Sequence, residues 1–309
     1  MRVIFFGSDD FAAVHLEALL KAGHEVLACV MGPDKAQGRG MKMVFSPIKE
    51  ISTTRQIPCL QPVSLKNADI VNELKTFHAD IFVVVAYGRL LTQEILDLPK
   101  MICINVHGSL LPKYRGAAPV NWAILNGDHE TGVTLQKMAL ALDAGDIIAQ
   151  EMILIDEHEN AAQLRQRMSQ VGADLLIKVL ERNFLGQFPL SPQNESQVTQ
   201  APKLTKEMSV IDWKKDARLI RDQVRGLQPW PGAVTIYNGK TLKITQVEIS
   251  KEDKGNFKPG QVINVGKNGF QVACGDGALL IKELQPEAGK LMPASSFVAG
   301  YKIASGFSF

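Results

Sequence analysis

The sequence predicts two domains: a doubly wound α/β domain in the first part of the chain and a small all-β domain in the last part. Its 309 residues suit two domains of ordinary size. Over about the first 150 residues, short apolar runs alternate with segments of helical periodicity, which is typical of βαβ units around a parallel sheet. After about residue 230, apolar residues recur at every second position between turn residues, as in short antiparallel strands.

The apolar pattern places the strands and helices of the α/β domain. The expected strands are 3–6, 25–31, 58–60, 81–86, 101–106 and 147–153, and the expected helices are 10–21, one opened by Ser46-Pro47, 68–77, 92–96 and 161–182. Residues 81–86 are apolar throughout, as in a central parallel strand that is covered on both faces. Ser46 and Pro47 match the N-cap and first position of a helix, and a long loop is expected before them.

A polar segment separates the two predicted domains. Residues 187–206 contain three prolines and many Ser, Gln and Thr residues, so we predict a linker at 189–206 between a domain of residues 1–188 and a domain of residues 207–309. A short helix is expected at 217–225, followed by strands at 233–237, 242–249, 260–265, 270–274 and 279–284. Asn-Gly and Asp-Gly turns join these strands, and an OB-like barrel is preferred over a sandwich.

Composition excludes several classes of protein. With 46% hydrophobic and 21% charged residues, the chain can bury a sizeable core and is not a disordered protein. Its longest apolar run is 81–86, too short to cross a bilayer, and no export signal is recognisable at the N-terminus, so a cytoplasmic protein without a membrane partner is expected. The four cysteines are scattered, without a C-x-x-C pair, and the histidines show no ligand spacing, so no metal is expected.

Charge is distributed unevenly along the chain. Residues 1–200 carry 18 basic and 22 acidic side chains, a net −4, whereas residues 201–309 carry 16 and 10, a net +6. Within the acidic part, the segment 35–49 holds Lys35, Arg39, Lys42 and Lys49 and no acid. The asymmetry suggests an anionic macromolecular partner, although an ordinary solvated surface explains the same charges.

Polar residues at the end of one predicted strand are the first candidates for chemistry. Ligands of open α/β sheets bind beyond the carboxyl ends of the strands. Asn105 and His107 end the strand 101–106 and, with a period of two, point the same way. An acid from the turn 142–146, such as Asp143, would orient the imidazole if the fold brought the two together. A structural histidine and an Asx-turn aspartate remain the plainer alternatives.

The same residues belong to a longer string. Residues 105–119 read Asn-Val-His-Gly-Ser-Leu-Leu-Pro-Lys-Tyr-Arg-Gly-Ala-Ala-Pro, which resembles the Asn-x-His plus S-L-L-P-x-x-R-G-x-x-P signature of the formyltransferases that use 10-formyltetrahydrofolate. The spacing onward to 142–146 also matches, and further similar segments at 4–12, 33–40, 83–88 and 229–232 extend the likeness over essentially the whole chain. The resemblance implies a Rossmann-like catalytic domain. Among the members of the family, the chain is most similar to those that act on a charged tRNA.

The resemblance also implies roles for individual residues. Asn105, His107 and Asp143 match the catalytic amide, imidazole and carboxylate of the family. A methionyl amine would attack the formyl carbon, Asn105 and a protonated His107 would donate hydrogen bonds to the oxyanion of the tetrahedral intermediate, and Asp143 would hold His107 and help to move protons. The residues expected to bind the folate are Ser109, Leu110, Leu111, Pro112, Tyr87, Gly88 and Asp146.

A tRNA partner is implied by the basic loop. In the family this loop enters the acceptor-stem end of initiator Met-tRNA, and its readers here would be Lys35, Arg39 and Lys42. The chain departs from the family pattern at Asp9, where proline is usual, and at Met41, where lysine is common. We expect a monomer.

Two questions stay open at this point. A structural ion pair is favoured for Arg115 over an anchor for an anionic group. The rival functions are formyl transfer to a purine-pathway ribonucleotide or a nucleotide-linked amino sugar, release of formate from the same folate, and non-catalytic RNA binding. A nicotinamide dehydrogenase is disfavoured because the first turn lacks a G-x-G-x-x-G loop.

Overall fold

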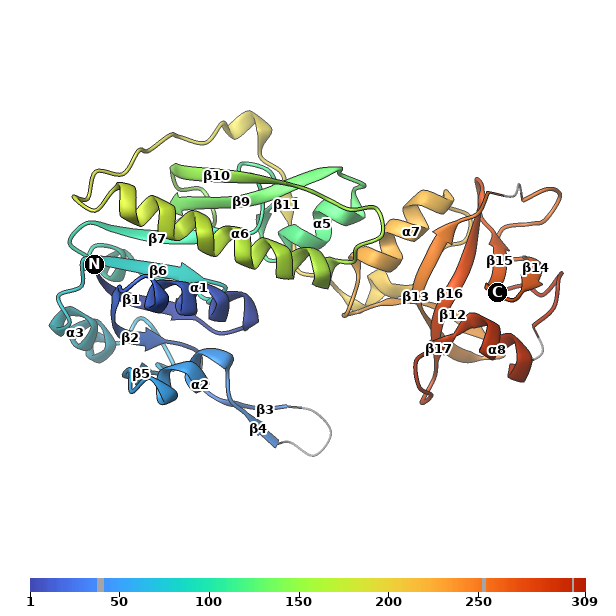
Figure 1. Cartoon of the computed structure of the whole chain (residues 1–309), viewed down its shortest axis with the longest axis horizontal. Helices are drawn as coiled ribbons and strands as arrows, with labels where there is room; N and C mark the ends of the chain where they lie inside the picture. Colours follow the sequence, from blue (N-terminus) through green and yellow to red (C-terminus); the bar gives the residue numbers. More distant parts are fainter. Residues whose placement is uncertain (38–41, 252–253, 302) are drawn as a thin grey trace. The chain divides into compact units, whose positions relative to one another are not determined.

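The computed structural model describes residues 1–37, 42–251, 254–301 and 303–309, with the backbone alone for 35–37 and 42–44. The chain forms two compact units (Figure 1). The first consists of Met1–Pro119, Glu130–Leu154 and Arg165–Ala201, and the second of Val120–His129, Ile155–Leu164 and Pro202–Phe309.

A seven-stranded sheet, counted over the described residues, organises the first unit in the order β10-β9-β7-β6-β1-β2-β5 (Figure 1). Its strands are β1 (Arg2–Gly7), β2 (Glu25–Val30), β5 (Cys59–Leu60), β6 (Ile81–Val85), β7 (Ile102–His107), β9 (Glu130–Lys137) and β10 (Ile147–Leu154). Pairing is parallel from β7 to β5 and antiparallel at β9 and β10. The strand order reverses between β1 and β6, which confirms the predicted doubly wound sheet. Strand β9 is not among the predicted strands.

Helices cover both faces of this sheet. The helices of the first unit are α1 (Asp10–Lys21), α2 (Pro47–Thr54), α3 (Ala68–Thr76), α4 (Gln93–Leu96) and most of α6 (Ala161–Arg182), whereas α5 (Pro119–Leu125) belongs almost wholly to the second unit. Ile4 and Phe6 of β1 share a buried cluster with Leu74 of α3 and Ile95 of α4. On the opposite face, Gly172 of α6 packs against Val106 of β7. Among the described helices none has both the length and the apolar character needed to cross a membrane.

The second unit is built on an antiparallel sheet in the order β12-β13-β16-β15-β14, with β17 paired to β16. Its elements are α7 (Ala217–Gly226), β12 (Ala233–Tyr237), β13 (Lys240–Ile249), β14 (Val262–Gly266), β15 (Gly269–Ala273), β16 (Ala278–Pro286), β17 (Met292–Pro293) and α8 (Ala294–Tyr301). Trp213, Phe270 and Phe297 are the largest aromatic side chains of its core. The predicted change from an α/β domain to an antiparallel β domain is therefore confirmed, with α8 as an addition.

Short elements complete the chain. They are β3 (Lys35–Gln37), β4 (Lys42–Val44), β8 (Arg115–Gly116), β11 (Gln200–Ala201) and two 3-10 turns, Glu195–Gln197 and Lys206–Ser209. β3 and β4 pair antiparallel, so the segment expected to be a long loop contains short strands. β11 pairs in parallel with β8, which attaches part of the predicted linker to the first unit.

Asp9, one of the departures from the family pattern, has a clear structural role. Its carboxylate caps α1 by accepting a hydrogen bond from the backbone N–H of Ala12 at 3.1 Å. The same carboxylate forms an ion pair with Arg165 of α6, whose guanidinium lies over the ring of Phe11. Asp9 therefore joins the start of α1 to α6.

A buried histidine lies in the same region. His15 of α1 is fully buried, its Nδ1 donates to the carbonyl of Phe11 at 2.8 Å, and its Nε2 has no partner among the described residues. Burial, helped by the nearby positive charge of Arg165, lowers the pKa of His15 from 6.5 to about 4 despite the opposing effect of the hydrogen bond to the Phe11 carbonyl. The folded chain therefore holds His15 neutral.

We expect His15 to make the fold acid-sensitive. His15 takes up a proton near pH 6.5 in the unfolded chain and only near pH 4 in the folded chain. The full stability is therefore present above pH 6.5 and is lost as the pH falls from 6.5 toward 4. The loss corresponds to about 3 kcal/mol. The free energy of unfolding of the wild type, taken relative to that of His15→Gln, should therefore fall by that amount from pH 7 to pH 4. Urea denaturation of both proteins at the two pH values measures this. The exposed His158→Gln variant is the matched control, and a difference between the wild type and His15→Gln that stays constant from pH 7 to pH 4 would contradict the prediction.

Candidate functional site

Three polar side chains predicted from the sequence converge at the end of β7. Asn105 and His107 lie on β7, and Asp143 lies in the turn that joins the neighbouring strands β9 and β10. The Asn105 amide donates to Asp143 Oδ1 at 3.5 Å, and His107 Nδ1 lies 3.5 Å from the same oxygen. The structure thus brings together an amide, an imidazole and a carboxylate from segments 36 or more residues apart.

The Asp143 carboxylate is the centre of this group. Its side chain is only 9% exposed, and it also accepts hydrogen bonds from the backbone N–H of Gly116 at 2.9 Å and from Gln136 Nε2 at 3.1 Å. These contacts from several directions fix the orientation of the carboxylate. The backbone of Asp143 has a φ of +51°, an uncommon conformation for a residue with a side chain.

Both ring nitrogens of His107 face oxygen acceptors. While Nδ1 faces Asp143, Nε2 lies 2.9 Å from the backbone carbonyl of Tyr114. A carbonyl can only accept, so Nε2 carries a proton and donates it to the Tyr114 carbonyl, while Nδ1 is directed at the Asp143 carboxylate. Because the ring is 6% exposed, water competes little with these partners. The two contacts therefore fix the orientation of the ring.

The segment that follows β7 is held from inside the protein. Ser109 is fully buried and donates to the Lys113 carbonyl, and Thr134 Oγ1 donates to the Ser109 carbonyl at 2.6 Å. The same Thr134 oxygen accepts from the Leu111 N–H at 3.0 Å and from Gln150 at 2.8 Å. Of the residues predicted to contact folate here, Ser109 and Leu111 are buried, and Leu110 and Pro112 are partly exposed.

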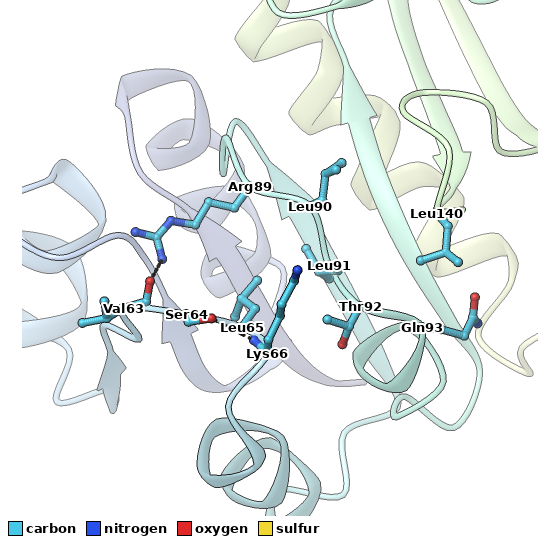
Figure 2. Close-up of a pocket in the computed structure, with 10 residues that line it drawn as sticks. All are labelled: Val63, Ser64, Leu65, Lys66, Arg89, Leu90, Leu91, Thr92, Gln93 and Leu140. Carbon is cyan, nitrogen blue, oxygen red and sulfur yellow. Dashed lines mark hydrogen bonds between the residues drawn. The ribbon is translucent and has the colours of Figure 1, made fainter.

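A pocket of about 510 Å³ opens beside the ends of β6 and β5 in the first unit. Figure 2 shows its lining, made of Val63, Ser64, Leu65, Lys66, Arg89, Leu90, Leu91, Thr92, Gln93 and Leu140. Arg89 is fixed on the carbonyls of Pro62 and Val63. Leu140 precedes Asp143 by three residues in the same turn, so this pocket and the polar group share one segment.

The remaining predicted folate contacts are Tyr87, Gly88 and Asp146. Tyr87 packs edge-on against Phe6 in the core, so its side chain points away from solvent, whereas Gly88 is exposed in a turn with a φ of +74°. Asp146 is partly exposed, and its carbonyl accepts from the Lys137 N–H at 2.9 Å. Of these three residues, Gly88 leaves its backbone most open to a ligand.

Arg115 forms the predicted structural ion pair. Its guanidinium is 9% exposed and binds Glu195 at 2.7 Å, and this contact holds the pKa of Glu195 below its usual value. It also donates from Nε and Nη2 to Gln193 Oε1 at 3.0 and 2.8 Å. Glu195 and Gln193 lie in the polar segment predicted as a linker.

Sequence reasoning missed three residues of the site. Gln136, Thr134 and Gln193 each carry an uncharged side chain of common type, without a motif around it, and their roles follow from contacts across the fold. Of the predicted tRNA readers, Arg39 lies outside the described residues, and Lys35 and Lys42 are described by backbone only, in β3 and β4. Over the described side chains, no group of three or more His, Cys, Asp or Glu could hold a metal ion.

Comparison with known proteins gives a consistent result. A family model described as formyl transferase matches residues 1–180, and one described as formyl transferase, C-terminal domain, matches 203–302. A methionyl-tRNA formyltransferase of Caldanaerobacter subterraneus subsp. tengcongensis is 45% identical over 307 residues, which is 99% of each chain. One from Citrifermentans bemidjiense is 42% identical over 99% of this chain and 95% of its own. An N-formyltransferase from Helicobacter canadensis, solved with folinic acid and dTDP-3-aminofucose, has a TM-score of 0.69 at 22% identity, over 92% of this chain and 99% of that one.

The two buried threonines of β9 provide a test of the segment after β7. Thr134→Val would leave the partners of its hydroxyl unsatisfied, so the free energy of unfolding should fall by about 1 to 3 kcal/mol. Thr131, also buried, has a hydroxyl without a partner among the described residues, so Thr131→Val should be neutral or stabilising. Chemical denaturation of both variants checks this, and equal losses would argue against a special role for Thr134.

Proposed function

The chain belongs to the methionyl-tRNA formyltransferase family, and we propose that it transfers the formyl group of 10-formyltetrahydrofolate to the amino group of methionine on initiator Met-tRNA. The observation that carries this proposal is the convergence of Asn105, His107 and Asp143 at the carboxyl end of β7. Formyl transfer needs hydrogen-bond donors for an oxyanion and a path for protons, and these three side chains supply both.

Asn105 is the proposed first donor to the oxyanion. Attack of the methionyl amine on the formyl carbon places negative charge on the formyl oxygen of a tetrahedral intermediate. Asn105 gives one amide N–H to Asp143 over a long 3.5 Å contact, which leaves its other N–H for that oxygen. A donor that is already fixed in place needs no reorganisation during the reaction.

His107 supplies the positive charge beside that oxygen. In its doubly protonated form, the ring neutralises the developing anion. Its Nε2–H, which is bonded to the Tyr114 carbonyl in the structure, would leave that carbonyl and donate to the oxyanion instead. Asp143 holds the ring in place through Nδ1. The same carboxylate is the proposed relay for the proton that leaves the amine on its way to the folate nitrogen.

The pocket beside β6 fits the folate. Its apolar lining includes Leu65, Leu90, Leu91 and Leu140, which suit a flat ring system, and the lining residue Lys66 suits the anionic end of a folate. β6 and β7 are adjacent parallel strands, so residues after β6 lie beside the end of β7. A donor in this pocket could present its formyl group to Asn105 and His107, with Gly88 offering its backbone.

Charge supports tRNA as the acceptor. Residues 201–309 carry a net charge of +6, and segment 35–49 has basic residues and no acid. Basic side chains on a β domain are a common means of binding RNA through its phosphates. We propose Arg39, with Lys35 and Lys42, as readers of the acceptor-stem end, and Met41 as a position that gives a shallower salt dependence of tRNA binding.

Formyl transfer to charged initiator tRNA, elongator tRNA and free methionine tests the proposed function. The initiator tRNA should be formylated fastest, and Asn105→Ala, His107→Ala and Asp143→Ala should each lower kcat about 100- to 1,000-fold because an oxyanion donor or its support is lost. Transfer to all three acceptors at equal rates would contradict the tRNA-specific proposal. Near-normal turnover in the three folded variants would overturn the catalytic assignment, and formate release without an acceptor would indicate a hydrolase.

Arg39 provides a separate test of tRNA recognition. Arg39→Ala should weaken Met-tRNA binding by about 1 to 3 kcal/mol and slow formylation, because a cation that stacks on a base or pairs with phosphate is removed. Arg55→Ala, an exposed arginine at the end of α2, is the matched control. Filter binding at several salt concentrations measures both. If Arg39→Ala behaves like the control, the segment is not the reader.

A further inference from the structure

We infer that Gln193 is a positioning residue for Asp143, an inference that rests on the proposed function. Gln193 belongs to the polar segment between the two matched family models, at 1–180 and 203–302. Its amide nitrogen donates to the backbone carbonyl of Asp143 at 2.8 Å and to that of Gly145 at 2.7 Å. Gln193 therefore holds the backbone of the turn that carries the proposed proton relay.

The Gln193 amide is fully engaged. Both of its N–H bonds go to the turn, and its oxygen accepts from Nε and Nη2 of Arg115 at 3.0 and 2.8 Å. A glutamine amide offers two donor hydrogens and an oxygen with two lone pairs, so these contacts use its whole capacity and fix one orientation. The partly buried side chain therefore acts as a rigid bridge from Arg115 to the turn.

The turn needs such support because its backbone is strained and tightly packed. Asp143 has a φ of +51°, and a Cβ added to Gly145 would lie 1.6 Å from the Lys137 carbonyl. From inside, Gln136 binds the Asp143 carboxylate and accepts from the Gly145 N–H at 3.2 Å. From the other side, Gln193 binds the carbonyls of the same two residues. Together, the two glutamines fix the carboxylate and the backbone that carries it.

Other contacts hold Gln193 itself in place. Ser191 pairs with Ile147 of β10 through backbone hydrogen bonds of 2.8 and 2.9 Å, and β11 pairs with β8. Arg115, which binds Gln193, precedes Gly116, whose N–H binds Asp143 Oδ2. These contacts form a closed ring. The Asp143 carboxylate binds Gly116, the neighbouring residue Arg115 binds Gln193, and Gln193 binds the Asp143 carbonyl.

Gln193→Met tests the inference because methionine has a similar length and cannot bind the carbonyls. Initiator Met-tRNA formylation should show kcat lowered about 10- to 100-fold, since small displacements of a catalytic group have effects of this size. KM for both substrates should stay within about twofold, as no substrate contact is removed. Gln197→Met, an exposed glutamine four residues along, should match the wild type.

Gln193→Glu tests the contact with the turn separately from the contact with Arg115. The glutamate keeps an acceptor for Arg115 but points an oxygen at the carbonyls of Asp143 and Gly145, so its kcat should fall at least as far as that of Gln193→Met. Because it retains the Arg115 contact, this variant also serves if Gln193→Met fails to fold. A normal kcat in folded Gln193→Glu would overturn the inference.

A double-mutant cycle shows whether Gln193 acts through Asp143. In an Asp143→Asn background, Gln193→Met should lower kcat by less than about threefold, because the relay that it positions is already lost. An equal fold-loss in both backgrounds, or a Gln193→Met variant indistinguishable from Gln197→Met, would overturn the positioning role. If the wild type itself does not formylate Met-tRNA, the proposed function fails. If the wild type is active and the Gln193 variants are equally active, only the inference about Gln193 fails.

Discussion

The buried carboxylate of Asp143 is the interaction on which the site depends. A charge withdrawn from water must be surrounded by donors, and the donors around Asp143 come from three different strands: Asn105 and His107 from β7, Gly116 from β8 and Gln136 from β9. Satisfying this one group therefore fixes the ends of neighbouring strands relative to one another. The arrangement that stabilises the anion also aligns the amide and imidazole beside it.

Much of this arrangement could be predicted from local sequence. The alternation of apolar runs with helical segments indicates a doubly wound sheet, and period-two patterning indicates the change to an antiparallel domain. Asn105 and His107 share a face because side chains alternate along a strand. The meeting of these residues with Asp143 follows from a motif resemblance, because nothing in their spacing alone requires it.

The remaining features depend on contacts that have no local signal. Gln193 is 50 residues from the Asp143 carbonyl that it binds, and its surroundings in the sequence are typical of a linker. Strand β9 contains polar residues that face inward, Thr134 and Gln136, because they bind loops beyond the sheet. Asp9 looks like a departure from a pattern until its partner Arg165 is known. In each case tertiary packing, rather than local propensity, decides the role.

The pairing of β11 with β8 has a consequence for biosynthesis. Ala201, at the end of β11, leaves the ribosome 58 residues after Asp143. Because synthesis adds about 5 to 20 residues per second, roughly 3 to 12 s pass between Asp143 and the end of the segment that packs around its turn. For most of that interval Arg115 has neither Gln193 nor Glu195 to bind, because these residues follow Asp143 by 50 and 52 positions. The order of residues along the chain thus makes completion of the site a late event in the life of each new molecule.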